Sequence, residues 1–133
     1  PAGMVYAKTA HAQPYFDEAG APAVYPLYHV VSGLAGLSGG KVVATRSAAP
    51  GKVAALAVRG RSGATLWLAN LTGEPQTAKV SGFSGAAQLH MLDEGSFVAA
   101  TRDAGWLNKG GKALKKVGSI KLAPYAVARI AAS

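Results

Sequence analysis

Short apolar runs separated by turn residues fill the chain after the Gly39-Gly40 pair. Each run has the length of a β-strand, and Gly, Pro, Asn, Asp or Ser residues stand between successive runs. Many short runs at near-regular spacing are typical of a β-sandwich or a small barrel. We predict strands at residues 41–46, 53–59, 64–71, 76–80, 87–92, 97–101, 119–123 and 125–131.

The runs do not alternate with helical segments, which argues against a parallel sheet. The sequence therefore predicts a mainly β fold, an antiparallel β-sandwich of about seven or eight strands with one N-terminal helix. Periodicity alone does not separate a sandwich from a small barrel. Residues 60–63 (Gly-Arg-Ser-Gly) lie between two apolar runs and predict a hairpin. Alternation within the next run places Leu66 and Leu68 on one face of the sheet and Trp67 on the other.

The chain has a different character before Gly39-Gly40. Apolar residues recur at three- and four-residue spacing between positions 27 and 37, which predicts a helix. Pro26 is tolerated only in the first turn, so we expect the helix to begin near Tyr25 or Pro26 and to end at the glycine pair. Residues 4–7 predict a strand and residues 8–20 a loop. The sequence thus divides into residues 1–40, a strand–loop–helix segment, and residues 41–133, the sandwich.

The composition excludes several classes of protein. The 133-residue length suits one domain, and the absence of cysteine rules out disulfides, cysteine-based zinc sites, iron–sulfur clusters and thiol nucleophiles. No apolar stretch is long enough to span a membrane, and no secretory signal is visible at the start. Because the chain begins at Pro1, we expect a fragment, a processed chain or an internal boundary. The compartment stays unknown, with the cytoplasm favoured.

The net charge of +8 is distributed unevenly. Residues 1–40 hold Lys8 against Asp17 and Glu18, whereas the rest of the chain holds 13 basic and four acidic residues. A basic domain attracts nucleic acid, acidic polysaccharide or an anionic surface. The more ordinary interpretation is a solvated face, because no aromatic pattern typical of single-strand binders accompanies the lysines. The densest cluster comprises Lys109, Lys112, Lys115, Lys116 and Lys121.

No complete catalytic or metal-binding pattern is present in the sequence. The three histidines, His11, His29 and His90, lack the spacing of a metal pair on one element. The acidic pairs 17–18 and 93–94 are adjacent, whereas glycosidase carboxylates face each other across a sugar. Nucleophile elbows, phosphate-binding loops and dinucleotide fingerprints are absent too. We therefore predict no catalytic residue, no metal site and no cofactor, and hence no enzyme activity for this chain alone.

Two tryptophans are candidates for stacking on sugar rings. Trp106 follows Gly105 in a predicted loop, which makes it the better candidate. Trp67 lies inside an apolar strand, where a tryptophan more often belongs to the core.

Three segments together resemble a known family. Residues 25–36 (YPLYHVVSGLAG) resemble the last helix of the (β/α)8 barrel in glycoside-hydrolase-like enzymes. Residues 66–72 (LWLANLT), with 74–76 (EPQ) after them, resemble the middle strand and turn of the β-sandwich that follows such barrels. Residues 120–130 (IKLAPYAVARI) are similar to the closing strand of that sandwich. The family with the closest resemblance is the C-terminal region of D-apionate lactonase-type proteins.

The resemblance implies a role within a larger enzyme. Residues 4–7 would be the eighth barrel strand, and the following loop would line the rim of the substrate pocket through His11, Tyr15 and Phe16. Catalytic groups of such barrels gather at the C-terminal ends of the strands, most of which lie outside this chain. The partner of the sandwich would be the barrel domain of the parent chain. In its absence, the barrel-facing surface could mediate self-association.

These observations predict a non-catalytic accessory β-sandwich domain that supports the barrel of a carbohydrate-active hydrolase or lactonase. One alternative is a carbohydrate-binding module that uses the two tryptophans. The other is polyanion or nucleic-acid binding through the basic residues, with an affinity that falls steeply with salt.

Overall fold

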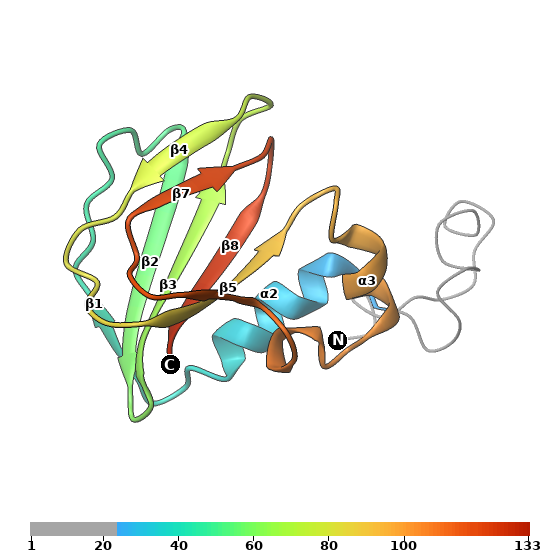
Figure 1. The fold of residues 1–133 in the computed structure, drawn as a ribbon, viewed down its shortest axis with the longest axis horizontal. Helices are drawn as coiled ribbons and strands as arrows, with labels where there is room; N and C mark the ends of the chain where they lie inside the picture. Colours follow the sequence, from blue (N-terminus) through green and yellow to red (C-terminus); the bar gives the residue numbers. More distant parts are fainter. Residues whose placement is uncertain (1–23) are drawn as a thin grey trace. The chain divides into compact units, whose positions relative to one another are not determined.

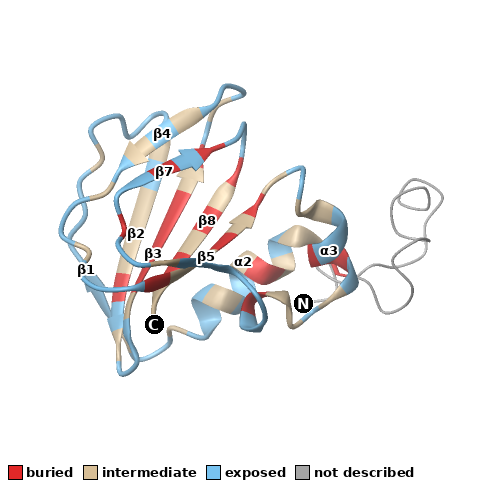
Figure 2. Cartoon of the chain, viewed as in Figure 1, coloured by how far each residue is buried: buried red, intermediate tan, exposed pale blue. Residues whose placement is uncertain are grey.

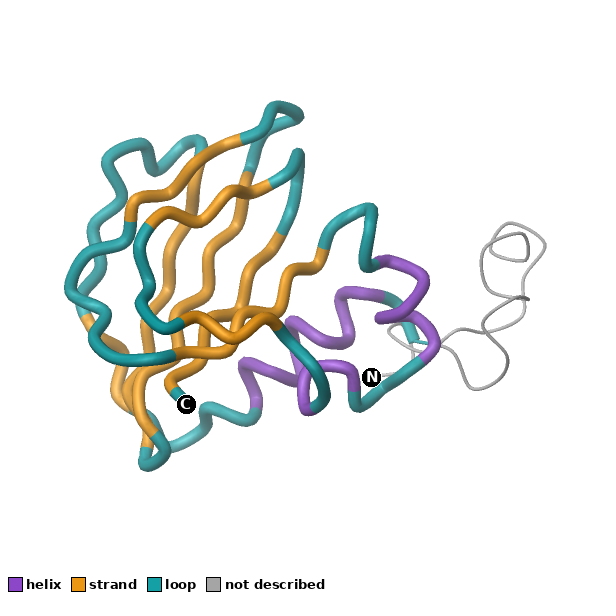
Figure 3. Tube along the Cα trace, viewed as in Figure 1, coloured by secondary structure: helices purple, strands orange, loops and turns teal. Residues whose placement is uncertain are grey.

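The structure is a computed structural model that describes residues 24–133. The strand predicted at residues 4–7 and the loop predicted at 8–20 lie outside these residues. The chain forms two compact units. We call the first the helical unit, whose described parts are residues 24–38 and 94–110, and the second the strand unit, Gly39–Asp93 with Gly111–Ser133. Figure 3 shows the helices within the first unit and the strands of the two sheets within the second.

The strand unit contains two antiparallel sheets (Figure 1). The larger sheet has six strands in the order β1-β2-β3-β8-β5-β6, and the smaller sheet pairs β4 with β7. The strands are β1 (Lys41–Val43), β2 (Val53–Gly60), β3 (Gly63–Asn70), β4 (Gln76–Lys79), β5 (Ala87–Leu92), β6 (Lys112–Leu114), β7 (Ser119–Leu122) and β8 (Val127–Ala132). The mainly β sandwich predicted from the sequence is confirmed.

The core of the strand unit lies between its two sheets. Leu66 and Leu68 of β3 and Ile130 of β8 pack in one cluster with Ile120 and Leu122 of β7. The most buried positions of the unit lie along β3, β7 and β8 (Figure 2). Full burial of one such side chain contributes about 1.5–3 kcal/mol, so this cluster holds the two sheets together. The predicted alternation is confirmed, because both leucines belong to the cluster.

The predicted hairpin joins β2 to β3. Gly60 pairs with Gly63 across the turn, so the loop consists of Arg61 and Ser62. The backbone of Gly63 has a φ of 115°, and a Cβ placed there would lie 2.9 Å from the Cβ of Ala132. Glycine is therefore required at this position both by the backbone conformation and by the neighbouring strand.

The helical unit begins with the predicted helix, α2 (Pro26–Ala35). Pro26 occupies its first turn, as the sequence predicts. The helix ends earlier than the glycine pair, because Leu37 and Ser38 donate backbone hydrogen bonds to residues three positions earlier and tighten the last turn. Gly39, with a φ of 82°, then directs the chain away from the helical path.

The strand predicted at residues 97–101 is wrong, since this segment forms the helix α3 (Phe97–Arg102). Ala100 and Thr101 are both buried, although neighbouring residues of a strand point to opposite faces. The Thr101 hydroxyl donates a hydrogen bond of 2.8 Å to the carbonyl of Phe97, four residues earlier. A short 3-10 helix, η3 (Trp106–Asn108), follows where the sequence predicts a loop. Strand β6 was not predicted, because its three residues form no apolar run.

Candidate functional site

Asn70, at the end of β3, is a buried polar side chain of the strand unit that forms several hydrogen bonds. It is 3% exposed, and its Nδ2 donates hydrogen bonds to the carbonyls of Glu74 at 2.7 Å and Ala123 at 2.9 Å. Its Oδ1 accepts from the backbone N–H of Thr72 at 2.9 Å and from the Thr72 hydroxyl at 2.8 Å. One amide thus joins the end of β3 and the turn directly after it to residue Ala123, 53 positions later in the sequence. We call this group of contacts the Asn70 corner.

The same corner holds a strained turn between β7 and β8. The N–H of Ala126 donates to the carbonyl of Ala123, and Pro124 and Tyr125 occupy the two central positions of the turn. Tyr125 has a φ of 55°, a left-handed conformation that is uncommon for a residue with a bulky side chain. Its N–H donates to the carbonyl of Thr72 at 3.0 Å, which ties the turn to the Asn70 corner. The Tyr125 side chain is 71% exposed.

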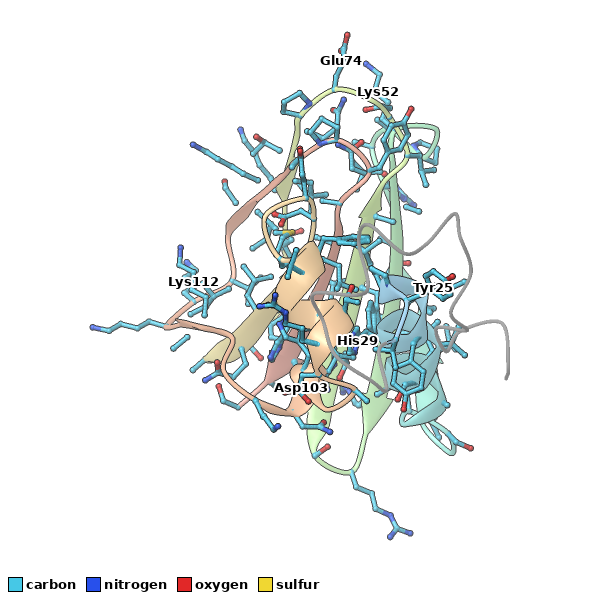
Figure 4. The ribbon with its side chains drawn as sticks, turned by 90° about the vertical axis from the view of Figure 1, so that its right-hand side faces the viewer. Tyr25, His29, Lys52, Glu74, Asp103 and Lys112 are labelled. Atoms are coloured by element: carbon cyan, nitrogen blue, oxygen red, sulfur yellow. The ribbon has the colours of Figure 1, made fainter. Side chains whose placement is uncertain are left out.

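The hydrogen bonds of the Asn70 corner hold the backbone in place and leave no group available for catalysis. Asn70 begins an Asn-Leu-Thr glycosylation sequon, yet its amide nitrogen is occupied by backbone carbonyls and the residue is buried. Lys52 and Glu74 lie near one end of the strand unit in Figure 4, and the carbonyl of Lys52 accepts from the N–H of Leu71. The arrangement fixes loops to the core, and it contains no nucleophile with an adjacent base.

A second polar cluster, centred on His29 of α2, lies in the helical unit (Figure 4). His29 is 1% exposed, and its Nε2 lies 2.6 Å from the carbonyl of Ala100 in α3. The Trp106 ring lies 5.5 Å from the imidazole, centroid to centroid, and the Tyr28 ring lies 5.6 Å from it in an edge-to-face arrangement. The histidine therefore connects the two helices and η3 as a packed, hydrogen-bonded residue.

An ion pair lies at the surface of the same unit. Lys109 Nζ contacts Asp103 Oδ2 at 3.0 Å, and the N–H of Gly105 donates to Asp103 Oδ1 at 2.8 Å. These bonds, above all the one from Lys109, hold the pKa of the Asp103 carboxyl below its ordinary value of 3.8. The pair stabilises the turn that carries Trp106.

Of the five candidate site residues predicted from the sequence, the structure describes two, Trp67 and Trp106. His11, Tyr15 and Phe16 lie outside the described residues, so their position at a pocket rim stays a prediction. Trp106 is half-buried beside His29. Trp67 is 5% exposed on the sheet face opposite the core cluster, so its ring offers no open surface for a sugar to stack on.

Sequence reasoning missed the row of residues beside Trp67. The register of the larger sheet places Arg129 of β8 directly opposite Trp67, and His90 of β5 opposite Arg129. Burial lowers the pKa of the Arg129 guanidinium from its ordinary value. These residues come from three strands far apart in the sequence, and only the strand order could have revealed the row.

Within residues 24–133, no group of three or more His, Asp or Glu side chains is arranged to hold a metal ion. The described helices are all too short or too polar to cross a membrane.

The comparison with protein families identifies the fold. The family model described as the D-apionate lactonase, C-terminal immunoglobulin-like domain, matches residues 50–130, which is more than half of the chain. The chain belongs to this family. The match extends from the turn before β2 into β8 and so contains the whole Asn70 corner. Comparisons with curated proteins and with solved structures found no match.

Proposed function

We propose that the chain is a non-catalytic accessory domain of an enzyme of the D-apionate lactonase type. The family is described as a C-terminal immunoglobulin-like domain of such a lactonase, which supports this role. The hydrogen bonds of the two buried polar side chains, Asn70 and His29, also support the non-catalytic role. Asn70 and His29 are occupied by backbone carbonyls, so they organise loops and helices rather than a substrate.

We further propose that the domain supports a (β/α)8 barrel formed by the rest of the parent chain. The observation that carries this proposal is the apolar stripe of α2. Leu27, Val31 and Leu34 are 59%, 39% and 37% exposed. Their spacing of four and three residues places them on one face of the helix. An apolar helix face of this kind is suited to packing against another domain.

The test compares two neighbouring lysine substitutions on α2 in the full-length enzyme. Val31→Lys places a charge on the apolar stripe, whereas Ser32→Lys adds the same charge at an exposed position on another side of the helix. We expect Val31→Lys to lower the Tm of the full-length enzyme by several degrees and Ser32→Lys to leave it unchanged. Neither substitution should change the Tm of the 133-residue chain alone, which separates lost docking from local damage.

Equal Tm values for the two variants of the full-length enzyme would contradict the docking role. Hydrolysis of a sugar-acid lactone by the 133-residue chain alone would contradict the non-catalytic assignment.

The position of His11, Tyr15 and Phe16 at the pocket rim belongs to the same proposal. Substitutions His11→Ala and Tyr15→Phe in the full-length enzyme should raise KM, because rim residues contact substrate before the chemical step. Unchanged kinetics for both variants would contradict the rim assignment and leave the docking role intact.

A further inference from the structure

The strand unit carries most of the basic residues of the protein, 11 of its 14 Lys and Arg. Against these it contains two acidic residues, Glu74 and Asp93. The segment from Gly111 to Ser133, which forms β6, β7 and β8, has no acidic residue. The structure shows where part of this charge gathers.

The outward face of the smaller sheet is built from lysines and hydroxyl side chains. In the register of β4 and β7, Thr77 pairs with Lys121 and Lys79 pairs with Ser119, and all four residues are exposed. The intervening residues point inward to the core cluster. The two lysines are thus diagonal neighbours, with Cα atoms about 7–8 Å apart, and the two hydroxyls occupy the other diagonal. Figure 1 shows β4 and β7 side by side, and Figure 2 shows their exposed positions.

Lys115 and Lys116 lie in the turn that leads into β7 and add two exposed charges within four residues of Ser119. Both are exposed, and Val117 directly after them is 2% exposed and belongs to the core cluster. The N–H of Val80 donates to the carbonyl of Gly118 at 2.9 Å, which closes the β4–β7 pair at this end. The backbone under the lysines is therefore anchored. We call Lys79, Lys115, Lys116 and Lys121, with Thr77 and Ser119, the lysine face.

The lysine face has no carboxylate of its own. Among residues 24–133, none of its four lysines forms an ion pair, whereas Lys109 is paired with Asp103 in the helical unit. Like charges on one sheet face repel one another, so four lysines without a counter-charge are unfavourable for folding. A ligand that brings its own negative charges would remove this repulsion.

We propose that the lysine face binds an acidic polysaccharide, whose sugar units carry both carboxylates and hydroxyl groups. A checkerboard of ammonium and hydroxyl groups complements such a polymer, since each ammonium pairs with a carboxylate and each hydroxyl with a sugar oxygen. Nucleic acid fits the face less well. The face has no aromatic side chain on which bases stack, no arginine fork for phosphate, and no helix to enter a groove.

The test measures binding of polygalacturonate, with neutral dextran and duplex DNA as comparison polymers, at several salt concentrations. The protein should bind polygalacturonate, bind DNA more weakly at the same salt, and not bind dextran. Lys79→Gln/Lys121→Gln should lower the affinity for polygalacturonate at least tenfold and reduce its salt dependence. Lys41→Gln/Lys52→Gln removes the same charge from exposed positions elsewhere in the strand unit and should lower the affinity less than twofold.

All four positions are exposed, so no variant should have a lower Tm than the parent protein. Equal losses in the two double variants would overturn the proposal, because net charge alone would then explain binding. Failure to bind polygalacturonate at low salt would overturn it as well. Tighter binding of DNA, lost in Lys79→Gln/Lys121→Gln, would assign the face to nucleic acid instead.

Discussion

The Asn70 corner makes a strong prediction about stability. Asn70→Ala removes two donated and two accepted hydrogen bonds of 2.7–2.9 Å. A typical bond contributes about 0.5–1.5 kcal/mol net, and buried carbonyls that lose their donor cost more. Because Thr72 and Glu74 lie close enough to solvent to recover bonds with water, we expect a loss of about 3 kcal/mol in the free energy of unfolding of the strand unit.

The assay is urea unfolding followed by tryptophan fluorescence, with linear extrapolation to water. The chain has two tryptophans, Trp67 in the strand unit and Trp106 in the helical unit. A Trp106→Phe background leaves Trp67 as the only reporter, so the signal follows the strand unit alone. Every variant is measured in this background.

Two further variants separate hydrogen bonding from packing. Asn70→Asp keeps the shape and the accepting oxygen but replaces the donor by an oxygen that faces backbone carbonyls, so it should cost at least as much as Asn70→Ala. Thr77→Ala, at an exposed position of β4, should change the stability by less than about 0.5 kcal/mol. A loss below about 1 kcal/mol for Asn70→Ala, or a neutral Asn70→Asp, would refute the reasoning.

Three other predictions concern single positions. Gly63→Ala should destabilise the strand unit by about 2 kcal/mol in urea unfolding, because its φ of 115° is unfavourable for alanine and the new Cβ meets Ala132. In an NMR titration, the Asp103 carboxyl should have a pKa below 3.8 that rises towards this value in Lys109→Met. Because folding lowers the pKa of Asp103, the ionised carboxylate stabilises the folded state. This stabilisation is complete above pH 3.8 and disappears as the pH falls through the folded-state pKa. Tyr125→Val should lower the free energy of unfolding by about 1–2 kcal/mol, since a β-branched residue is strongly disfavoured at a φ of 55°. Tyr125→Gly should lower it less, because glycine adopts this φ readily. Equal losses in the two variants would exclude backbone strain as the cause.

Local sequence signals predicted the elements in which propensity and burial agree. The hairpin at residues 60–63 was predictable because two glycines punctuate two long apolar runs. The core face of β3 was predictable because strand alternation assigns Leu66 and Leu68 to one side. In both cases neighbouring residues contain all the information needed.

The same signals failed where a short apolar run fits two conformations. Residues 97–101 contain one aromatic and two β-branched residues, which favour a strand, and two alanines, which favour a helix. Burial of both Ala100 and Thr101 decides for the helix, and that burial depends on packing within the helical unit. Strand β6 was missed for a related reason, since a three-residue edge strand with an exposed lysine has no apolar pattern.

The lysine face shows which features of a surface site the sequence alone does not predict. The sequence marks the cluster from Lys109 to Lys121, but it does not show that Lys109 belongs to the helical unit and is paired there. It also does not show that Lys79 lies beside Lys121, which follows from the pairing of Lys79 with Ser119. The pairing of β4 with β7 thus turns an ordinary run of lysines into a face of defined geometry.

The strand unit contains two kinds of polar side chain, a buried one that holds its loops together and exposed ones that are available to a ligand. Asn70 is buried among backbone carbonyls, where its hydrogen bonds fix the loops around β3, β4 and β7. Lys79 and Lys121 are exposed on the sheet that the same loops hold in register. Loosening the corner should therefore weaken the lysine face without removing any lysine. If the face binds an acidic polysaccharide, Asn70→Ala should lower that affinity, and added polymer should restore part of the lost stability because it binds only the folded state.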